Sequence, residues 1–255
     1  MPEIIAAFKN STLVKFEGAY SHFADIEDTS FFSPPLATPG IPTLRFGLVA
    51  PESRRASFAA DQFDRFKKII SILANYGLKP SMRHMAASAA SLLYPETHLD
   101  FIRLGISLYG LYSAPRKDKE KIKLLPVLSW KTLVAQIKII KKGETVGYGR
   151  TWIAKKTSRI AVLPIGYADG YSRRFGNNAK VIINGQYAPI VGRICMNMCM
   201  IDVTKIKNFK VEDEVIIIGQ AGKKEIAVEE LAKLDGTINY EIVARLNPLI
   251  NRKII

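Results

Sequence analysis

The sequence predicts an α/β domain followed by a mostly β domain. As far as about residue 113, apolar strand-like segments alternate with helical ones, which is typical of parallel β/α units. Beyond a charged linker over 115–123, short β-rich runs separated by turns replace that pattern. The 255-residue chain, with 48% hydrophobic and 24% charged residues, has the composition of a soluble globular protein and can bury a sizeable core. We therefore expect two domains, over 1–115 and 124–255.

The first domain is expected to contain three strands and one clear helix, over 18–23, 78–84, 101–106 and 57–76. Apolar side chains recur at helical spacing in the helix, namely Phe63, Phe66, Ile69, Ile70 and Leu73. Gly77 supplies the C-terminal stop of this helix. The stretch 30–57 contains Pro34, Pro35, Pro39, Pro42 and Pro51, which predicts an irregular surface loop.

The second domain is expected to be built from short strands, over 133–140, 160–165, 180–183, 187–194 and 215–218. Turns are predicted at Lys142-Gly143 and at Asn184-Gly185, the latter a strong hairpin signal. One late helix is predicted over 227–234.

Charge and cysteine content exclude several classes of protein. The formal charge is +14, but the basic residues are only partly clustered and no nucleic-acid-binding motif accompanies them. We interpret them as solvated surface with some attraction for a phosphate-bearing cofactor, and we expect no nucleic-acid partner. No apolar run reaches the ~18 to 20 residues of a membrane helix, and the N-terminus does not predict a signal peptide, so the expected location is the cytoplasm. Cys195 and Cys199 form neither a disulfide framework nor a metal site, which predicts free, buried thiols.

One tyrosine stands out for its chemistry. Tyr167 lies in the segment 166–171, between Gly166 and Gly170, directly after an apolar run. A tyrosine in a glycine-flanked turn at a strand end is little covered, and its phenol can carry a proton. Taken alone, Tyr167 is better explained as an ordinary loop aromatic residue.

Five segments together are more specific than that tyrosine. They are 18–24 (GAYSHFA), 84–92 (HMAASAASL), 100–110 (DFIRLGISLYG), 166–171 (GYADGY) and 192–198 (GRICMNM). These segments have the order and spacing of the signatures of alanine racemases. From about Phe16 to its C-terminus, the chain therefore resembles that family.

The resemblance implies the C-terminal two-thirds of such an enzyme. Residues 1–115 would form the C-terminal half of a (β/α)8 TIM-type barrel, with 30–57 as an insertion, because a complete barrel usually takes ~250 residues. Residues 124–255 would form the mostly β C-terminal domain. In the family, the lysine that forms the Schiff base with pyridoxal phosphate lies in an Ala-Tyr-Gly-His-Gly type segment. No lysine of this chain has that context, and the upstream arginine that binds the substrate carboxylate has no match either. A truncated or split gene product is expected.

The implied reaction is the interconversion of L-alanine and D-alanine with pyridoxal phosphate, which supplies D-alanine for the peptidoglycan of the cell wall. Racemisation needs two bases on opposite faces of a planar carbanion. The family lysine serves one face. The tyrosine matching Tyr167 serves the other and reaches across from a partner subunit, so an active form is expected to be a homodimer.

The resemblance also assigns supporting roles. His22 and Arg103 match residues that stabilise the phenolate, and His84 matches one that supports the arginine. Arg103 would face the pyridine nitrogen and, because it keeps its proton, would favour racemisation over transamination. Phosphate would be bound by Ser88 and by the N–H groups of Gly105 and Ile106.

The N–H of Met196 would bind the substrate carboxylate. Structural explanations stand beside these roles: Ser88 as a small residue of an alanine-rich helix, Met196 as a core residue, and His22 and His84 as structural histidines.

Three positions depart from the family pattern. Asn197 stands where an aspartate is common, Ala87 replaces an asparagine beside Ser88, and Ile254 lies where relatives supply a phosphate-binding tyrosine. Two hypotheses remain open. One is a racemase whose front portion is encoded elsewhere, and the other is a catalytically inactive remnant or partner-binding fragment.

Overall fold

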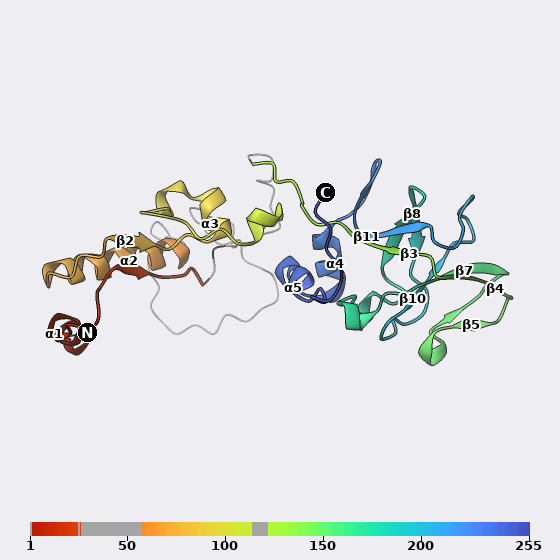
Figure 1. Ribbon diagram of the computed structural model, residues 1–255, viewed down its shortest axis with the longest axis horizontal. Helices are drawn as coiled ribbons and strands as arrows, with labels where there is room; N and C mark the ends of the chain where they lie inside the picture. The colour runs from red at the N-terminus through yellow and green to blue at the C-terminus, as the bar shows by residue number, and fades with distance from the viewer. Residues whose placement is uncertain (1, 25, 27–57, 114–121) are drawn as a thin grey trace, which may run out of the picture. The chain divides into compact units, whose positions relative to one another are not determined.

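The computed structural model describes residues 2–24, 26, 58–113 and 122–255, and the chain divides into two compact units (Figure 1). The units comprise residues 1–124 and 125–255. The insertion predicted over 30–57 lies outside the described residues.

The first unit combines helices with one pair of parallel strands. Its elements are α1 (Pro2–Asn10), β1 (Gly18–Tyr20), α2 (Phe58–Asn75), β2 (Met82–His84), α3 (Ser88–Leu93) and the 3₁₀ helices at Pro95–Thr97 and Ile106–Tyr109. Strands β1 and β2 pair in the register Gly18 with Met82 and Tyr20 with His84. Helix α2 confirms the predicted helix and ends just before Gly77, whose φ is +82°.

The barrel predicted for this unit is not seen in the described residues, where β1 and β2 are its only paired strands. The predicted strand over 101–106 is wrong. That segment makes a single parallel bridge, between Ala87 and Arg103, and Ile106 already begins a 3₁₀ helix. Phe101 and Leu104 are apolar, but each is 40% exposed, so neither is buried as a residue of a central strand would be. Apolar composition alone does not make a strand, because a strand needs a neighbour to pair with.

A compact apolar cluster holds the first unit together. It contains Phe23, Ala59, Phe63, Phe66, Met85, Ala86, Ala90 and Tyr94, which come from α2, from α3 and the residue after it, and from the segments that follow β1 and β2. The cluster packs beside the ends of β1 and β2, close to the predicted site residues His22 and His84.

The second unit is mostly β, as predicted. Its strands are β3 (Trp130–Leu133), β4 (Gln136–Ile140), β5 (Thr145–Val146), β6 (Trp152–Ile153), β7 (Ser158–Leu163), β8 (Lys180–Ile183), β9 (Gln186–Pro189), β10 (Cys199–Asp202), β11 (Glu214–Ala221) and β12 (Lys224–Ile226). One antiparallel sheet has the order β10-β7-β4, a second runs β12-β11-β8-β9 with β3 paired to β11, and β5 pairs with β6 in a third. The predicted run over 133–140 is therefore two strands in two sheets.

Turns and helices complete the second unit. Asn184 and Gly185 both have positive φ, +46° and +67°, and they join β8 to β9 in the predicted hairpin. Helix α4 (Val228–Asp235) matches the predicted helix, while α5 (Asn239–Ala244) follows it without having been predicted. Both thiols are free and buried, as predicted.

Candidate active site

Arg103 is the centre of a polar cluster in the first unit. Its guanidinium donates to Nδ1 of His84, to Nδ1 of His22 at 2.9 Å, and to the carbonyl oxygens of Ser21 (3.0 Å) and Met85 (3.2 Å). The pairing of β1 with β2 brings His22 and His84 together, because the register continues with Ser21 N–H donating to His84 O. Three of the predicted site residues thus lie in direct contact.

These contacts fix the state of both imidazoles. A guanidinium has donors only, so each Nδ1 must accept, and the ring proton of each neutral histidine lies on Nε2. Burial, together with the charge of Arg103, lowers the pKa of His84. His84 therefore supports the arginine as a neutral acceptor.

Neighbouring side chains hold this cluster in place. The His84 ring stacks on Tyr20 with centroids 5.3 Å apart, and its centroid is 4.0 Å from that of Phe101. Arg83 binds Asp100 through Nε at 2.7 Å and Nη2 at 2.9 Å, which anchors the segment that leads to Arg103. This pairing also lowers the pKa of the Asp100 carboxyl.

Ser88 organises a second group beside the first. It opens α3, is 2% exposed, and accepts from the N–H groups of Gly105 (2.9 Å) and Ser107 (3.4 Å) through Oγ. The Gly105 N–H is thus bonded within the protein. The Ile106 N–H and the Arg103 Nε have no hydrogen-bond partner among the described residues. The alternative of Ser88 as a mere small helix residue does not account for these bonds.

In the second unit, Tyr167 opens a 3₁₀ turn (Tyr167–Asp169) that is bonded to a second turn. Tyr167 N–H donates to Cys195 O at 3.1 Å and Ala168 N–H to Met196 O at 2.9 Å. A Cβ on Gly166 would lie 2.3 Å from Cys195 O and 2.4 Å from Met196 O, so only glycine allows this approach. The Tyr167 side chain is 44% exposed.

Met196 belongs to that second turn. Its side chain is 59% exposed, so Met196 is not a core residue. The turn closes through Cys195 N–H donating to Met198 O at 2.9 Å. The Met196 N–H has no partner within the described part of the chain.

The segment after α5 braces the Tyr167 turn from its other side. Asn247 donates through N–H to Asp169 O at 3.2 Å and through Nδ2 to Ala168 O at 3.0 Å. Gly170 has φ +98°, and a Cβ there would lie 2.4 Å from Arg245 O. Nothing in the sequence predicted Asn247 as part of this site.

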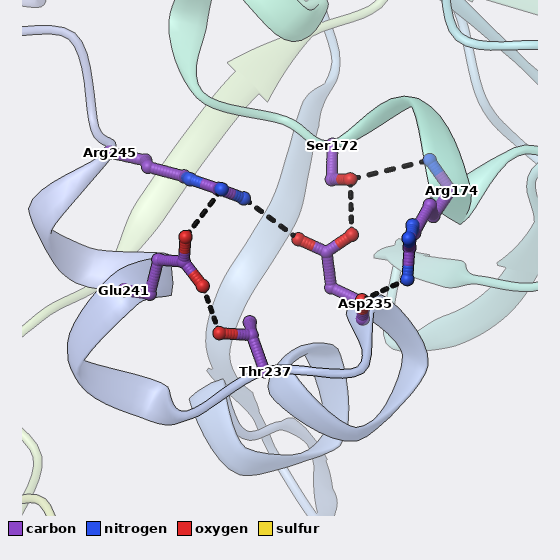
Figure 2. Close-up of polar contacts among 6 residues, drawn as sticks. All are labelled: Ser172, Arg174, Asp235, Thr237, Glu241 and Arg245. Atoms are coloured by element: carbon purple, nitrogen blue, oxygen red, sulfur yellow. Dashed lines mark hydrogen bonds and ion pairs between the residues drawn. The ribbon is translucent and has the colours of Figure 1, made fainter.

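Figure 2 shows how α4 and α5 are tied to the residues that follow Tyr171. The Asp235 carboxylate, with a side chain 4% exposed, accepts from Ser172 Oγ at 2.5 Å and from Arg245 Nη1 at 3.2 Å. Arg174 Nη1 donates to Asp235 O at 2.8 Å. Arg245 also pairs with Glu241, which accepts from Thr237 Oγ1.

The structure therefore forms two local groups from the predicted site residues. His22, His84, Ser88, Arg103, Gly105 and Ile106 lie in the first unit, and Tyr167 and Met196 lie in the second. No cluster of three or more metal-ligating side chains occurs among the residues described. Within those same ranges, every helix is too short or too polar to cross a membrane.

Comparison with known protein families gives two adjoining matches. Residues 1–113 match the family described as "Alanine racemase, N-terminal domain", and residues 127–254 match "Alanine racemase, C-terminal domain".

Among curated relatives, alanine racemase 1 of Clostridium acetobutylicum is 37% identical over 98% of this chain and 58% of its own length. The alanine racemase of Desulforamulus reducens is 43% identical over 77% of this chain and 52% of its own length. The chain thus spans little more than half the length of these relatives.

Solved structures give the same match. Alanine racemase from Bacillus anthracis with bound L-Ala-P superposes with a TM-score of 0.80 at 30% identity, covering 96% of this chain and 57% of that one. The Clostridium difficile 630 enzyme in complex with cycloserine gives 0.79 at 31% identity, over 96% and 58%.

Proposed function

Since this chain belongs to the alanine racemase family, we propose that it carries part of the machinery that interconverts L-alanine and D-alanine. The observation that carries the proposal is the Arg103 cluster, in which two imidazole nitrogens and two carbonyls fix one guanidinium. Such a cluster gives a positive charge a defined position, and no carboxylate among the described residues forms an ion pair with it.

The residues present fit pyridoxal phosphate. Within the described ranges, Arg103 Nε has no partner and would serve the pyridine nitrogen, and the Ile106 N–H, beside the buried Ser88 hydroxyl, has none and would serve the phosphate. When bound, the cofactor withdraws electrons from the α-carbon of the amino acid, so that the α-proton becomes removable. Because a guanidinium keeps its proton at neutral pH, Arg103 would leave the nitrogen of a bound pyridine ring unprotonated, which suits racemisation.

The second unit supplies the groups for the amino acid itself. We assign to Tyr167 Oη the removal or return of the α-proton on one face, and to the Met196 N–H the binding of the α-carboxylate. The exposure of Tyr167 supports a role toward a site that includes another subunit, so the active form is proposed to be a homodimer. A lysine on the other face would have to come from a segment outside these 255 residues.

The sequence context of the lysines favours one second candidate, a catalytically inactive fragment. None of them lies in an Ala-Tyr-Gly-His-Gly type segment. Such a fragment would still fold its two local groups, and it would show no racemisation even with the rest of the enzyme present.

Reconstitution decides between the two. The part of the Clostridium acetobutylicum enzyme that this chain does not cover is supplied as a fusion or as a separate polypeptide, with pyridoxal phosphate. Racemisation of each alanine enantiomer is followed by circular dichroism.

Activity is expected with the natural sequence and is expected to vanish in both directions with Tyr167→Phe, because each direction needs both bases. Deuterium exchange on the lysine face should survive in that variant. Tyr187→Phe, a tyrosine on β9, is the matched control. Normal racemisation by Tyr167→Phe would refute the assignment.

Cofactor binding is tested without activity. Ser88→Ala should weaken the binding of pyridoxal phosphate to the unfused chain, measured by fluorescence titration, by about tenfold, because a buried hydroxyl and the donors it aligns are lost. Ser91→Ala is the control on the same helix, since Ser91 Oγ only bonds Ala87 O. Equal affinities in the two variants would remove Ser88 from the proposed site.

A further inference from the structure

We infer that Asn247 is a positioning residue, which fixes the turn that carries Tyr167 relative to the N–H of Met196. The inference rests on the proposed function for its catalytic meaning, and on hydrogen bonds within the second unit for its geometry. Asn247 is assigned no contact with substrate or cofactor. It acts only through the main chain of the turn.

Two bonds join the turn of Tyr167 to the turn of Met196. Tyr167 N–H donates to Cys195 O at 3.1 Å, and Ala168 N–H donates to Met196 O at 2.9 Å. The distance from the phenol to the Met196 N–H therefore depends on where the Ala168 main chain lies.

The carbonyl oxygens of the Tyr167 turn depend on Asn247. Its N–H donates to Asp169 O at 3.2 Å, and its Nδ2 donates to Ala168 O at 3.0 Å. No other donor to these two oxygens occurs among the described residues. Ala168 is thus held on both sides, by Met196 at its N–H and by Asn247 at its carbonyl. A carbonyl that lost this donor would turn toward water and would take the adjoining peptide groups with it.

Asn247 is itself held firmly enough to act as a fixed point. Its Oδ1 accepts from Leu249 N–H at 2.9 Å, so the amide has one bonded acceptor and one bonded donor, and its orientation is determined. Arg245, two residues earlier, is bound by Asp235 and Glu241 (Figure 2). The segment that presents Asn247 is therefore anchored to α4 and α5.

The consequence for the proposed reaction is a change in turnover and not in substrate binding. The Met196 turn is closed by its own bond, from Cys195 N–H to Met198 O, so the proposed carboxylate contact survives when the other turn shifts. The phenol does not keep its place. A misplacement of about 1 Å in a reacting group can cost on the order of a hundredfold in rate.

Asn247→Asp is the sharpest variant. It keeps the shape of the side chain and an acceptor for Leu249 N–H, but it places an oxygen against Ala168 O where the donor was. Amide hydrogen exchange is measured by NMR on the ¹⁵N-labelled full chain. The amides of Tyr167 and Ala168 should exchange faster by about tenfold, because the bonds between the two turns open more often. Asn251→Asp adds the same charge at an exposed position and should leave both rates unchanged.

Ile182→Val separates a local effect from a general loss of stability. Ile182 lies in β8 and is 1% exposed, so its truncation weakens the core of the unit. It should speed the exchange of amides that open only by global unfolding and leave those of Tyr167 and Ala168 unchanged. Equal acceleration of these two amides by Asn247→Asp and Ile182→Val, or none by Asn247→Asp, would overturn the inference.

The reconstituted enzyme gives the catalytic readout. Asn247→Asp should lower kcat for alanine racemisation by about tenfold and leave KM within about twofold, while Asn251→Asp should change neither. An unchanged kcat in Asn247→Asp would overturn the catalytic role. Inactivity of the natural sequence would refute the proposed function alone, because the exchange rates still decide whether Asn247 holds the turn.

Discussion

Arg103 donates to Nδ1 of His84, so this histidine can only be an acceptor at that nitrogen while the bond exists. The bond links the last residue of β2 to the segment 100–103, which is otherwise irregular. It is compatible both with His84 as a support for the arginine and with His84 as a hydrogen-bonded structural histidine.

The first prediction concerns the titration of His84. Burial and the Arg103 charge lower its pKa from the ordinary value of about 6.5. The unfolded chain then binds more protons, so the contribution of His84 to stability is complete above about pH 6.5 and is lost as the pH falls toward the folded-state pKa.

Arg103→Gln should raise the pKa of His84 but not to its ordinary value, because the burial remains. Titration of the imidazole resonances by NMR measures this. Arg65→Gln, on the exposed face of α2, should leave the His84 titration unchanged. No rise in the Arg103→Gln variant would show that the arginine charge is not felt at His84.

The second prediction concerns Gly166. Gly166→Ala should destabilise the second unit by about 3 kcal/mol, because its Cβ would overlap two carbonyl oxygens. Urea unfolding followed by tryptophan fluorescence reports on this unit alone, since Trp130 and Trp152 are the two tryptophans of the chain. Gly222→Ala is the control. It has open space within 4 Å and φ +59°, so it should cost only about 1 kcal/mol of backbone strain. Similar costs for both variants would contradict the close approach of the two turns.

The third prediction concerns Asp235. Asp235→Asn should lower the free energy of unfolding of the second unit by about 2 kcal/mol, because hydrogen bonds to a buried charge are lost at Ser172 and Arg245. The same fluorescence measurement applies. Asp213→Asn, whose carboxylate accepts only from the Lys210 N–H of a surface turn, should cost below about 1 kcal/mol. A smaller loss for Asp235→Asn than for Asp213→Asn would mean that the network in Figure 2 adds no stability.

The fourth prediction concerns Cys199. Burial raises the pKa of this thiol, and it is fully covered, so alkylation of the native chain at pH 8 should leave it unmodified. Alkylation in denaturant should modify both cysteines at similar rates. Peptide mass spectrometry distinguishes Cys199 from Cys195. Rapid native labelling of Cys199 would show that the strand β10 opens readily.

Local signals predicted the local parts of the fold. Helix α2 followed from the spacing of Phe63, Phe66 and their neighbours, and the β8–β9 hairpin followed from Asn184-Gly185. The strand over 101–106 failed because its pairing depends on residues distant in sequence. Within this segment only Arg103 forms a β-bridge, with Ala87.

The candidate site, like the fold, could be predicted from the sequence only in its local parts. Arg103, His84 and His22 could be proposed from their motifs, and the structure brings them together. Asn247 could not be found, because its amide bonds the main chain of Ala168 across 79 positions and no motif marks such a contact. The type of a side chain can be read from the sequence. The position of a backbone carbonyl that accepts a long-range hydrogen bond cannot.

The turn of Tyr167 and the turn of Met196 are joined through main-chain atoms only. The hydrogen bonds between them consequently do not involve the exposed side chains at 196–198, and the exchange of Asn197 for an aspartate would alter charge without moving either turn. Evolution can thus retune the electrostatics around the phenol one residue at a time while the scaffold that carries it stays fixed. Gly166 and Gly170 are closed to such substitution, because a Cβ at either position would overlap a main-chain carbonyl oxygen.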